Sequence, residues 1–305
     1  MSVRCEASVA GGVPIISTLK NNFIGVKINK ITGILNGTCN YILTNMLDEK
    51  NEFNDSLKKA QNLGYAEQHP NDDLNGLDTL FKISILSTIA FNSKINLNKI
   101  SYFGIQNITK EDVFFADRLG FRIKLLGICY KDKGKLKLLV SPFLISKKKE
   151  LSSVNQNHNA IIIESNDKNK NILLGEGAGG DATSISVLSD LTSLSCNKKS
   201  EYMFGISYKK LKKIQTSDKI ESNDLFFIRA KVLDRPGAIA AITTILKNYK
   251  ISIKSLFQEQ LNKNLFNVVI LTHKTKEKSI NLAALKLNKC IFLKGNAMIL
   301  SVLDV

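Results

Sequence analysis

The sequence predicts an α+β protein built from two folded parts. Its 305 residues are enough for two domains of ordinary size. Hydrophobic residues make up 44% of the chain and charged residues 23%, which are globular values and not those of a disordered or fibrous protein. Segments with helix and strand periodicity alternate along the chain, and the last part reads strand, helix, strand, strand, helix, strand.

The first part mixes strands and helices separated by clear turn signals. Asn36 and Gly37 form a strong turn signal, and Gly64 is a normal glycine just after a helix. Residues 195–224 are polar and rich in Lys and Ser, which favours a linker. The expected elements are a strand–turn at 6–16, a strand at 26–31, a helix capped by Thr38, a helix from 54 or 55 to 63, a helix from 77 to about 91, a helix at about 116–126, strands at 160–163 and 171–174 joined by a turn at 165–170, and a helix from 183 to about 194.

The last part has the clearest pattern. Alternating apolar residues predict strands, and apolar residues at helical spacing predict two helices between them. The expected elements are strands at 226–233, 251–259, 265–272 and 290–302 and helices at 238–248 and 276–287, with a break at Gly295 and Asn296 inside the final strand. The order βαββαβ is the ferredoxin-like arrangement.

The net charge of +16 is the unusual feature of the composition. Lys and Arg number 43 against 27 for Asp and Glu. Such an excess can indicate a nucleic-acid or membrane partner. The lysines are spread along both halves, however, and the chain is rich in Lys, Asn and Ile and has no Trp. We therefore favour a general compositional bias and expect no nucleic-acid or membrane partner.

Cysteine and hydropathy patterns indicate a reducing, cytoplasmic location. The 5 cysteines are odd in number and far apart, and the 3 histidines are isolated, so neither a disulfide framework nor a zinc site is expected. No apolar run reaches the ~18–20 residues needed to cross a bilayer. The first residues also lack the apolar core of a signal peptide.

Asp78 and Lys82 are the first candidate chemical pair. Four residues apart on a helix, they place a carboxylate and an ammonium on one face. An ordinary surface ion pair is the simpler interpretation. The helix is strongly apolar, however, and follows a loop containing Glu67, Asp72 and Asp73. A buried site is therefore plausible, and a buried lysine beside carboxylates could exchange a proton with a substrate oxygen.

Three glycine-containing segments are weaker candidates. The 175–181 segment precedes a helix and suits either phosphate binding or close chain packing. The 6–16 segment is a tight turn whose carbonyls could also bind a monovalent cation. The 234–237 turn precedes a helix and could receive a small carboxylate, although a plain strand-to-helix turn explains it equally well.

Taken together, these segments resemble the homoserine dehydrogenase family. The resemblance extends over about 1–195 in the family's order, and the residues from about 225 look like an ACT domain, a small-molecule regulatory module. The motifs that carry the resemblance are 6–16, 33–43, 63–82, 120–127 and 175–190. The resemblance therefore implies a mixed-sheet catalytic domain followed by a ferredoxin-like ACT domain.

The resemblance implies reduction of L-aspartate 4-semialdehyde to L-homoserine with NADP or NAD, in threonine, methionine and isoleucine biosynthesis. Lys82 matches the catalytic lysine. The resemblance also implies two further ligands, a sodium ion and an amino-acid effector, with threonine as the family expectation. It implies a homodimer as well. The matching positions are Asp78, Glu67 and Asp73 for substrate, Gly64, Glu67 and Gly179 for cofactor, Glu6, Val9, Gly11 and Val13 for sodium, and Asp234 and Gly237 for effector.

The sequence departs from the family pattern at its beginning. Family members start with a Rossmann domain of ~100–130 residues with a G-x-G-x-x-G fingerprint, which we do not find here. Within the matching part, His69 replaces a usual acid and Ala182 a usual proline. The predicted organisation is a remnant of the exit from a cofactor-binding domain at 1–15, a catalytic domain at 16–195, a linker at 196–224 and an ACT domain at 225–305.

Other functional classes stay open at this point. The chain could be a non-catalytic fragment or an amino-acid-binding, dimerising module that contains an ACT domain. The preference between NAD and NADP is also undecided, because the residue that determines it belongs to the Rossmann domain.

Overall fold

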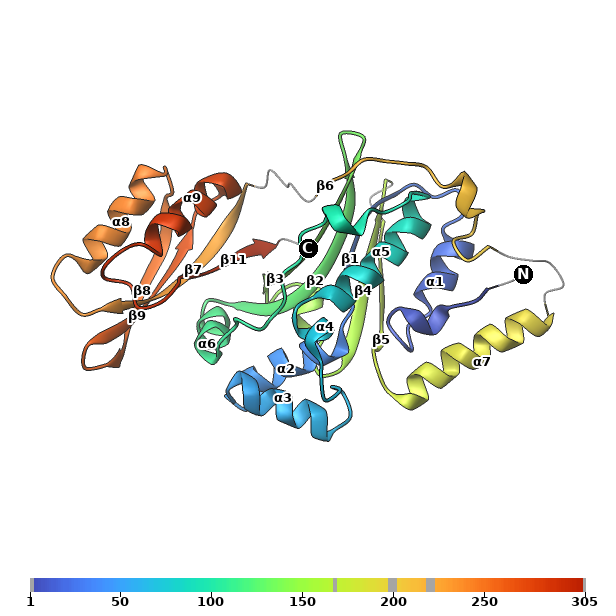
Figure 1. Cartoon of the computed structure of the whole chain (residues 1–305), viewed down its shortest axis with the longest axis horizontal. Helices are drawn as coiled ribbons and strands as arrows, with labels where there is room; N and C mark the ends of the chain where they lie inside the picture. The colour runs from blue at the N-terminus through green and yellow to red at the C-terminus, as the bar shows by residue number, and fades with distance from the viewer. Residues whose placement is uncertain (1–2, 167–168, 197–201, 218–222, 304–305) are drawn as a thin grey trace. The chain divides into compact units, whose positions relative to one another are not determined.

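The chain folds into two compact units that are interleaved in sequence. The computed structural model describes residues 3–166, 169–196, 202–217 and 223–303 (Figure 1). Unit 1 comprises 1–107, 124–142 and 150–219, and unit 2 comprises 108–123, 143–149 and 220–305. Two segments of the expected 16–195 domain thus belong to unit 2, and the domain boundaries drawn from the sequence stay a prediction.

Unit 1 is built on a mixed sheet with the strand order β5–β4–β1–β2–β3. β1 is antiparallel to its two neighbours, with Ile31 opposite Cys129 on β2 and Ile163 on β4. β6 pairs with β3 in parallel. The β4 residues 160–163 are all fully buried, as expected for an apolar run with both faces covered. The strands are β1 Ile28–Ile34, β2 Phe121–Asp132, β3 Lys135–Ser146, β4 His158–Ser165, β5 Lys170–Glu176 and β6 Thr216–Ser217.

Helices cover this sheet, and α5 packs against β1 (Figure 1). Its predicted bounds, 77 to 91, are those observed, because apolar residues lie on most sides of the helix and Asn92 ends it in a left-handed conformation with φ 49°. The α-helices of unit 1 are α1 Ile15–Ser17, α2 Gly37–Asp48, α3 Phe53–Asn62, α4 Asn71–Leu74, α5 Leu77–Phe91 and α7 Gly180–Cys196. Unit 1 also contains the π-helical segment η2 Thr18–Asn22 and the short 3-10 helices η1 Glu6–Ser8, η3 Leu97–Lys99, η4 Glu150–Ser153 and η5 Tyr208–Lys210.

Unit 2 contains the βαββαβ elements in a sheet of order β11–β7–β9–β8. These pairs are antiparallel, and the last residues of β3 add to β11 in parallel, with Phe143 opposite Ser301. The elements are α6 Lys110–Arg118, β7 Asn223–Leu233, α8 Ala238–Asn248, β8 Ile253–Asn262, β9 Leu265–Thr272, β10 Thr275–Lys276, α9 Glu277–Leu287 and β11 Met298–Leu303.

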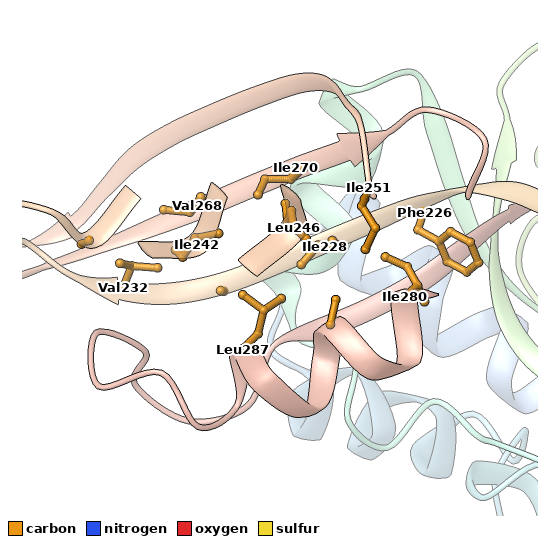
Figure 2. Packing of buried hydrophobic residues seen from close by; sticks show 13 residues of the cluster. Phe226, Ile228, Val232, Ile242, Leu246, Ile251, Val268, Ile270, Ile280 and Leu287 are labelled. Atoms are coloured by element: carbon orange, nitrogen blue, oxygen red, sulfur yellow. The ribbon is translucent and has the colours of Figure 1, made fainter. Parts of the chain in front are cut away.

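The hydrophobic core of unit 2 lies between this sheet and its two long helices. Figure 2 shows Leu246 of α8 and Leu287 of α9 beside Ile228 of β7 and Ile270 of β9, and all four are at most 1% exposed. Burying one such side chain contributes about 1.5–3 kcal/mol. The helical spacing of the apolar residues in α8 and α9 is therefore what attaches both helices to the sheet.

Several elements differ from the sequence prediction. The helix expected at 116–126 was wrong, because α6 occupies Lys110–Arg118 and β2 begins at Phe121. Thr109 and Asp112 form a capping box that starts α6 early, and Gly120, with φ 85°, follows its end. The final strand starts at Met298 and not at Cys290.

The predictions for the beginning of the chain and for the start of α2 also differ from the structure. The 6–16 segment contains the turn η1 and the short helix α1 instead of a strand. The cap of α2 is Asn36 and not Thr38, since the Asn36 side chain accepts a hydrogen bond from the amide of Cys39. Asn36 and Gly37, which the sequence indicated only as a turn, thus form the start of helix α2.

Parts of the expected linker and of one turn lie outside the described residues. These are 197–201 and 218–222 in the predicted 196–224 linker and 167–168 in the predicted 165–170 turn. Among the helices that are described, none is long and apolar enough to cross a membrane.

A buried ion pair joins α6 to the sheet of unit 2. Asp112 is fully buried and Arg229 is 6% exposed. The Arg229 Nη2 atom donates to Asp112 Oδ2 at 3.0 Å and to Thr109 Oγ1 at 3.1 Å, while Nε donates to Asp112 Oδ1. The same carboxylate accepts from the Thr109 amide at 2.9 Å. Both carboxylate oxygens of Asp112 and two nitrogens of Arg229 are therefore hydrogen-bonded, which favours a stable buried pair.

We expect Asp112→Ala to lower the free energy of unfolding of unit 2 by about 3–5 kcal/mol, because it leaves the Arg229 guanidinium buried without its partner. The matched control is Glu259→Gln, which breaks the exposed pair between Glu259 and Arg118 and should cost about 1 kcal/mol or less. Urea denaturation followed by circular dichroism measures both. Equal losses in the two variants would contradict this role for Asp112.

Candidate functional site

The side chains of Asp78 and Lys82 form an ion pair on α5. The distance from Lys82 Nζ to Asp78 Oδ2 is 2.8 Å, and the side chains are 20% exposed for Lys82 and 26% for Asp78. The predicted i,i+4 pairing is therefore observed, and the pair is half-buried instead of lying on an open surface. Partial burial strengthens the attraction relative to an exposed pair.

Asn36 connects this pair to a second carboxylate, Asp73 on α4. The Asn36 Nδ2 atom donates to Asp73 Oδ1 at 2.6 Å and to Asp78 Oδ2 at 2.8 Å. Asn36 is only 3% exposed and stands between the end of β1 and the start of α2. The segment before α2 and the consecutive helices α4 and α5 thus bring two carboxylates, one amide and one ammonium together.

Burial raises the pKa of the Asp73 carboxyl above its usual value. The charges of Asp78 and Glu67 raise it further, while the hydrogen bond from Asn36 and the charge of Lys82 lower it. A carboxylate in such surroundings gains from a cationic ligand, because an added positive charge compensates both for burial and for the neighbouring acids.

The thiol of Cys39 lies under the same cluster. Its Sγ atom donates to the carbonyl of Asp73 at 3.2 Å. Burial first, and then the charges of Asp73 and Asp78, hold the pKa of this thiol well above its usual value. Cys39 is therefore a neutral packing residue and does not provide a thiolate nucleophile.

Glu67 and Gly64 lie in the exposed loop between α3 and α4. Gly64 has a left-handed φ of 74° and faces open space. The carbonyl of Glu67 accepts from Gln61 Nε2 at 3.1 Å, which holds the loop against α3. The Glu67 carboxylate is close enough to Asp73 to affect its pKa, so this predicted residue joins the cluster electrostatically.

The glycine-rich 175–181 segment lies beside the start of α2. Gly177 N donates to the Asn157 carbonyl at 3.0 Å, and Asn157 Nδ2 donates to the Ala178 carbonyl at 3.2 Å. A Cβ on Gly37 would lie 2.8 Å from that Asn157 carbonyl, so only glycine permits this approach. Gly179 is exposed with φ 126° and open space around it, immediately before α7.

The predicted sodium residues form a tight turn at the beginning of unit 1. Both carboxylate oxygens of Glu6 accept backbone amides, from Ile16 and Ser17, each at 2.7 Å. The Gly11 carbonyl accepts from Ser186 Oγ at 2.6 Å, and the Val13 carbonyl accepts from Ile15 N at 2.7 Å. Val9 is fully buried. The Glu6 carboxylate and the carbonyls of Gly11 and Val13 thus already accept hydrogen bonds, and each of these oxygens keeps a lone pair that could ligate a cation.

No cluster of three or more His, Cys, Asp and Glu side chains suitable for a metal ion occurs among the described residues. A carbonyl-ligated ion at the 6–16 turn stays a prediction.

The predicted effector residues belong to unit 2. Asp234 and Gly237 form the turn between β7 and α8, and Gly237 precedes the helix with φ 88°. The Asp234 amide donates to the Asn264 carbonyl at 3.0 Å, which ties the turn to the β8–β9 connection. The Asp234 side chain is exposed.

Sequence reasoning missed Asn36 and Asn157 as site residues. Asn36 was recognised only as half of a turn signal. Its capping of α2 was readable, because asparagine is a favoured N-cap. Its bonds to Asp73 and Asp78 had no sequence signal, since they depend on where α4 and α5 lie after folding.

Comparisons with known proteins agree on one family. A family model described as homoserine dehydrogenase matches residues 14–192, more than half of the chain. The homoserine dehydrogenase of Bacillus subtilis is 35% identical over 278 residues, covering 89% of this chain and 63% of the relative. That of Helicobacter pylori is 38% identical over 282 residues, covering 92% and 66%. The chain thus spans slightly less than two thirds of these relatives.

Solved structures agree with the sequence comparison. A homoserine dehydrogenase from Thiobacillus denitrificans has a TM-score of 0.87 at 33% identity, covering 99% of this chain and 70% of that one. A homoserine dehydrogenase from S. aureus has a TM-score of 0.67 at 31% identity, covering 91% and 65%. The first of these similarities extends over both units described above.

We expect Asp73→Asn to stabilise the protein at neutral pH. The raised pKa means that the folded protein holds this proton more tightly than the unfolded chain, so ionised Asp73 opposes folding. The gain in melting temperature should be full above the folded pKa and should vanish as pH falls below the unfolded value of about 3.9.

The control is Asp72→Asn, an exposed neighbour on the same helix. It should leave the melting temperature nearly unchanged at every pH. Melting curves between about pH 8 and about pH 3 follow both variants. An Asp73→Asn variant that is less stable than the wild type at pH 7 would show that the ionised carboxylate helps to hold the fold.

Proposed function

Because this chain belongs to the homoserine dehydrogenase family, we propose that it reduces L-aspartate 4-semialdehyde to L-homoserine with NADP or NAD as the coenzyme. The observation that carries the proposal is the half-buried Asp78–Lys82 pair, which stands beside Asp73 and is joined to it through Asn36. The cluster combines a proton donor with carboxylates able to hold an amino group.

Lys82 is the proposed proton donor. When hydride adds to the aldehyde carbon, a C–H bond forms and the carbonyl π electrons move onto oxygen as a developing alkoxide. The Lys82 ammonium donates one proton to that oxygen and becomes a neutral amine, which later regains a proton from solvent. In the reverse direction the neutral amine accepts the homoserine hydroxyl proton. Asp78 orients the Nζ atom through their 2.8 Å contact.

Asp73, Asp78 and Glu67 are the proposed substrate-binding acids. A substrate ammonium would compensate for the burial of Asp73 and for the mutual repulsion of the acids. Lys82 lies 2.8 Å from Asp78, so an amino acid held by its ammonium on these acids would lie near the Nζ atom.

The nicotinamide coenzyme supplies the hydride. Gly179 and Gly64 have open space around them and left-handed φ values of 126° and 74°. Such exposed backbone fits the close approach of a coenzyme, and the N-terminal end of α7 after Gly179 suits a phosphate group. Glu67 is a further proposed coenzyme contact. NADPH oxidation by this chain alone, compared with the chain supplied with a cofactor-binding domain, measures whether these contacts suffice.

We propose sodium binding at the carbonyl oxygens of Glu6, Val9, Gly11 and Val13. Ala10 and Gly11 have consecutive left-handed φ values of 59° and 40°, and such a turn can direct successive carbonyls inward. Carbonyl oxygens have a second lone pair, so those that already accept one hydrogen bond can still ligate an ion.

For residues 225–305 we propose an ACT domain that binds an amino-acid effector, with threonine as the candidate. The order βαββαβ and the sheet order β11–β7–β9–β8 support this proposal. The first turn of α8 after Gly237 could receive the effector carboxylate, and Asp234 its ammonium. A cytoplasmic homodimer in threonine, methionine and isoleucine biosynthesis is the corresponding biological setting.

A non-catalytic, amino-acid-binding module is the rival proposal. The family match over 14–192 includes Lys82 and the acids Glu67, Asp73 and Asp78. This match does not support the non-catalytic proposal. Measurable NADPH oxidation with aspartate semialdehyde separates the two proposals directly.

We expect Lys82→Ala to reduce kcat by about 10²–10⁴-fold with only a modest loss of substrate binding, because it removes the general acid. The assay follows NADPH oxidation with aspartate semialdehyde, using this chain alone and supplied with the cofactor-binding domain of a relative. Lys59→Ala is the control, since Lys59 is an ion-paired but exposed lysine of the same unit. Turnover near the wild-type level in Lys82→Ala would exclude the proposed role.

We expect Asp234→Ala to weaken threonine binding by about tenfold, a loss of about 1.4 kcal/mol, because the effector ammonium loses its carboxylate. Isothermal titration calorimetry on the whole chain measures the affinity. Asp224→Ala, at another acidic position of unit 2, is the control. Unchanged affinity in Asp234→Ala, or no threonine binding to the wild type, would contradict the proposed effector site.

A further inference from the structure

We propose that Asn36 is a positioning residue that sets the spacing and charge of the two substrate-binding carboxylates, Asp73 and Asp78. This inference rests on the proposed function and assigns one of its determinants to a residue outside the catalytic pair. Asn36 acts through the two acids and exchanges no proton with the substrate.

The hydrogen bonds of Asn36 define its orientation. Nδ2 donates to Asp73 Oδ1 at 2.6 Å and to Asp78 Oδ2 at 2.8 Å, and Oδ1 accepts from the Cys39 amide at 2.8 Å. Reversing the amide would place its oxygen against two carboxylates and its NH₂ group against a backbone N–H. Only one orientation is therefore possible, and in it both N–H groups of the side chain are used.

The backbone around Asn36 holds the amide in place before any ligand binds. Asn36 lies just beyond the last residue of β1, and its carbonyl accepts from the Asn40 amide at 3.2 Å in the first turn of α2. Gly37 is in close contact with the Asn157 carbonyl. A strand end, a helix start and a neighbouring loop thus fix the side chain, which is 3% exposed. Such preorganisation avoids an entropy cost at binding.

The bridge leaves one oxygen of each acid for a ligand. Among the described residues, Asp73 Oδ2 and Asp78 Oδ1 make no hydrogen bond, whereas Asp73 Oδ1 and Asp78 Oδ2 are occupied by Asn36 and, for Asp78, also by Lys82. Asn36 therefore both separates the two charges and selects which oxygens face a substrate ammonium. Without it, the acids would repel each other or compete for Lys82.

The charged and titratable groups that act on Asp73 are Glu67 in the loop before α4, Asp78 and Lys82 on α5, and the Cys39 thiol beneath. Asn36 supplies the neutral donor among them, and its hydrogen bond lowers the pKa of Asp73. Removing this donor should move the titration of Asp73 to higher pH even in the absence of substrate.

The test uses Asn36→Ser and Asn36→Asp, because serine and aspartate both retain N-capping of α2 while removing the two N–H donors. The control is Asn45→Ser, a buried asparagine near the other end of the same helix that bonds to Glu49 and Asn51. The readouts are a ¹³C NMR titration of the Asp73 carboxyl and the separate values of KM and kcat for aspartate semialdehyde, measured with the cofactor-binding domain supplied.

We expect Asn36→Ser to raise the pKa of Asp73 and to raise KM by about tenfold or more, with a smaller change in kcat, because it removes two hydrogen bonds to charged groups. Asn36→Asp adds a third carboxylate and should have a larger effect on both. Asn45→Ser should change neither, although it can lower the melting temperature.

An Asn36→Ser protein with the wild-type Asp73 titration and the wild-type KM overturns the inference. So does an equal rise of KM in Asn45→Ser, since the effect would then be general to the helix. If the wild type turns over no semialdehyde while Asn36→Ser still shifts the Asp73 titration, the proposed function fails and the positioning of the carboxylates by Asn36 is supported.

Discussion

The proximity of two carboxylates, Asp73 on α4 and Asp78 on α5, is the constraint on which the site of unit 1 depends. Asp73 and Asp78 repel each other, and burial makes the ionised form of Asp73 costly. Lys82 neutralises one of them, and the Asn36 amide bonds to both. The fold tolerates this arrangement because β1, α2 and α5 pack firmly around it. A cationic ligand would reduce the repulsion between the two carboxylates, which is a physical reason for a ligand-binding site at this place.

The buried carboxylate of unit 2, Asp112, has different partners from the acids of the unit 1 site. Both carboxylate oxygens of Asp112 accept hydrogen bonds from Arg229, and Thr109 donates to the same carboxylate. The acids of unit 1 instead retain unbonded oxygens among the described residues. The contrast separates a structural ion pair from a cluster suited to binding, although both are built from the same residue types. In unit 1, Lys124 is 2% exposed and donates to Asn40 Oδ1 at 2.9 Å, so this lysine also has a structural contact.

Much of the secondary structure could be predicted from local sequence signals, namely apolar spacing and helix-end residues. Helices 77–91 and 238–248 were predicted with their observed bounds, because apolar spacing and end signals agree there. The helix expected at 116–126 was wrong, because most of its apolar residues belong to the buried strand β2, and periodicity alone does not distinguish a buried strand from a helix. The start of the observed helix α6 has a local signal, the capping box of Thr109 and Asp112.

The sequence by itself determined the family and the Asp78–Lys82 pair, since a spacing of four on a helix places both groups on one face whatever surrounds them. Only the tertiary structure decided that this pair is half-buried, that Asp73 joins it and that Asn36 holds the two acids. These contacts join positions about 40 residues apart, and no local pattern encodes them. They exist because α2, α4 and α5 pack together after folding.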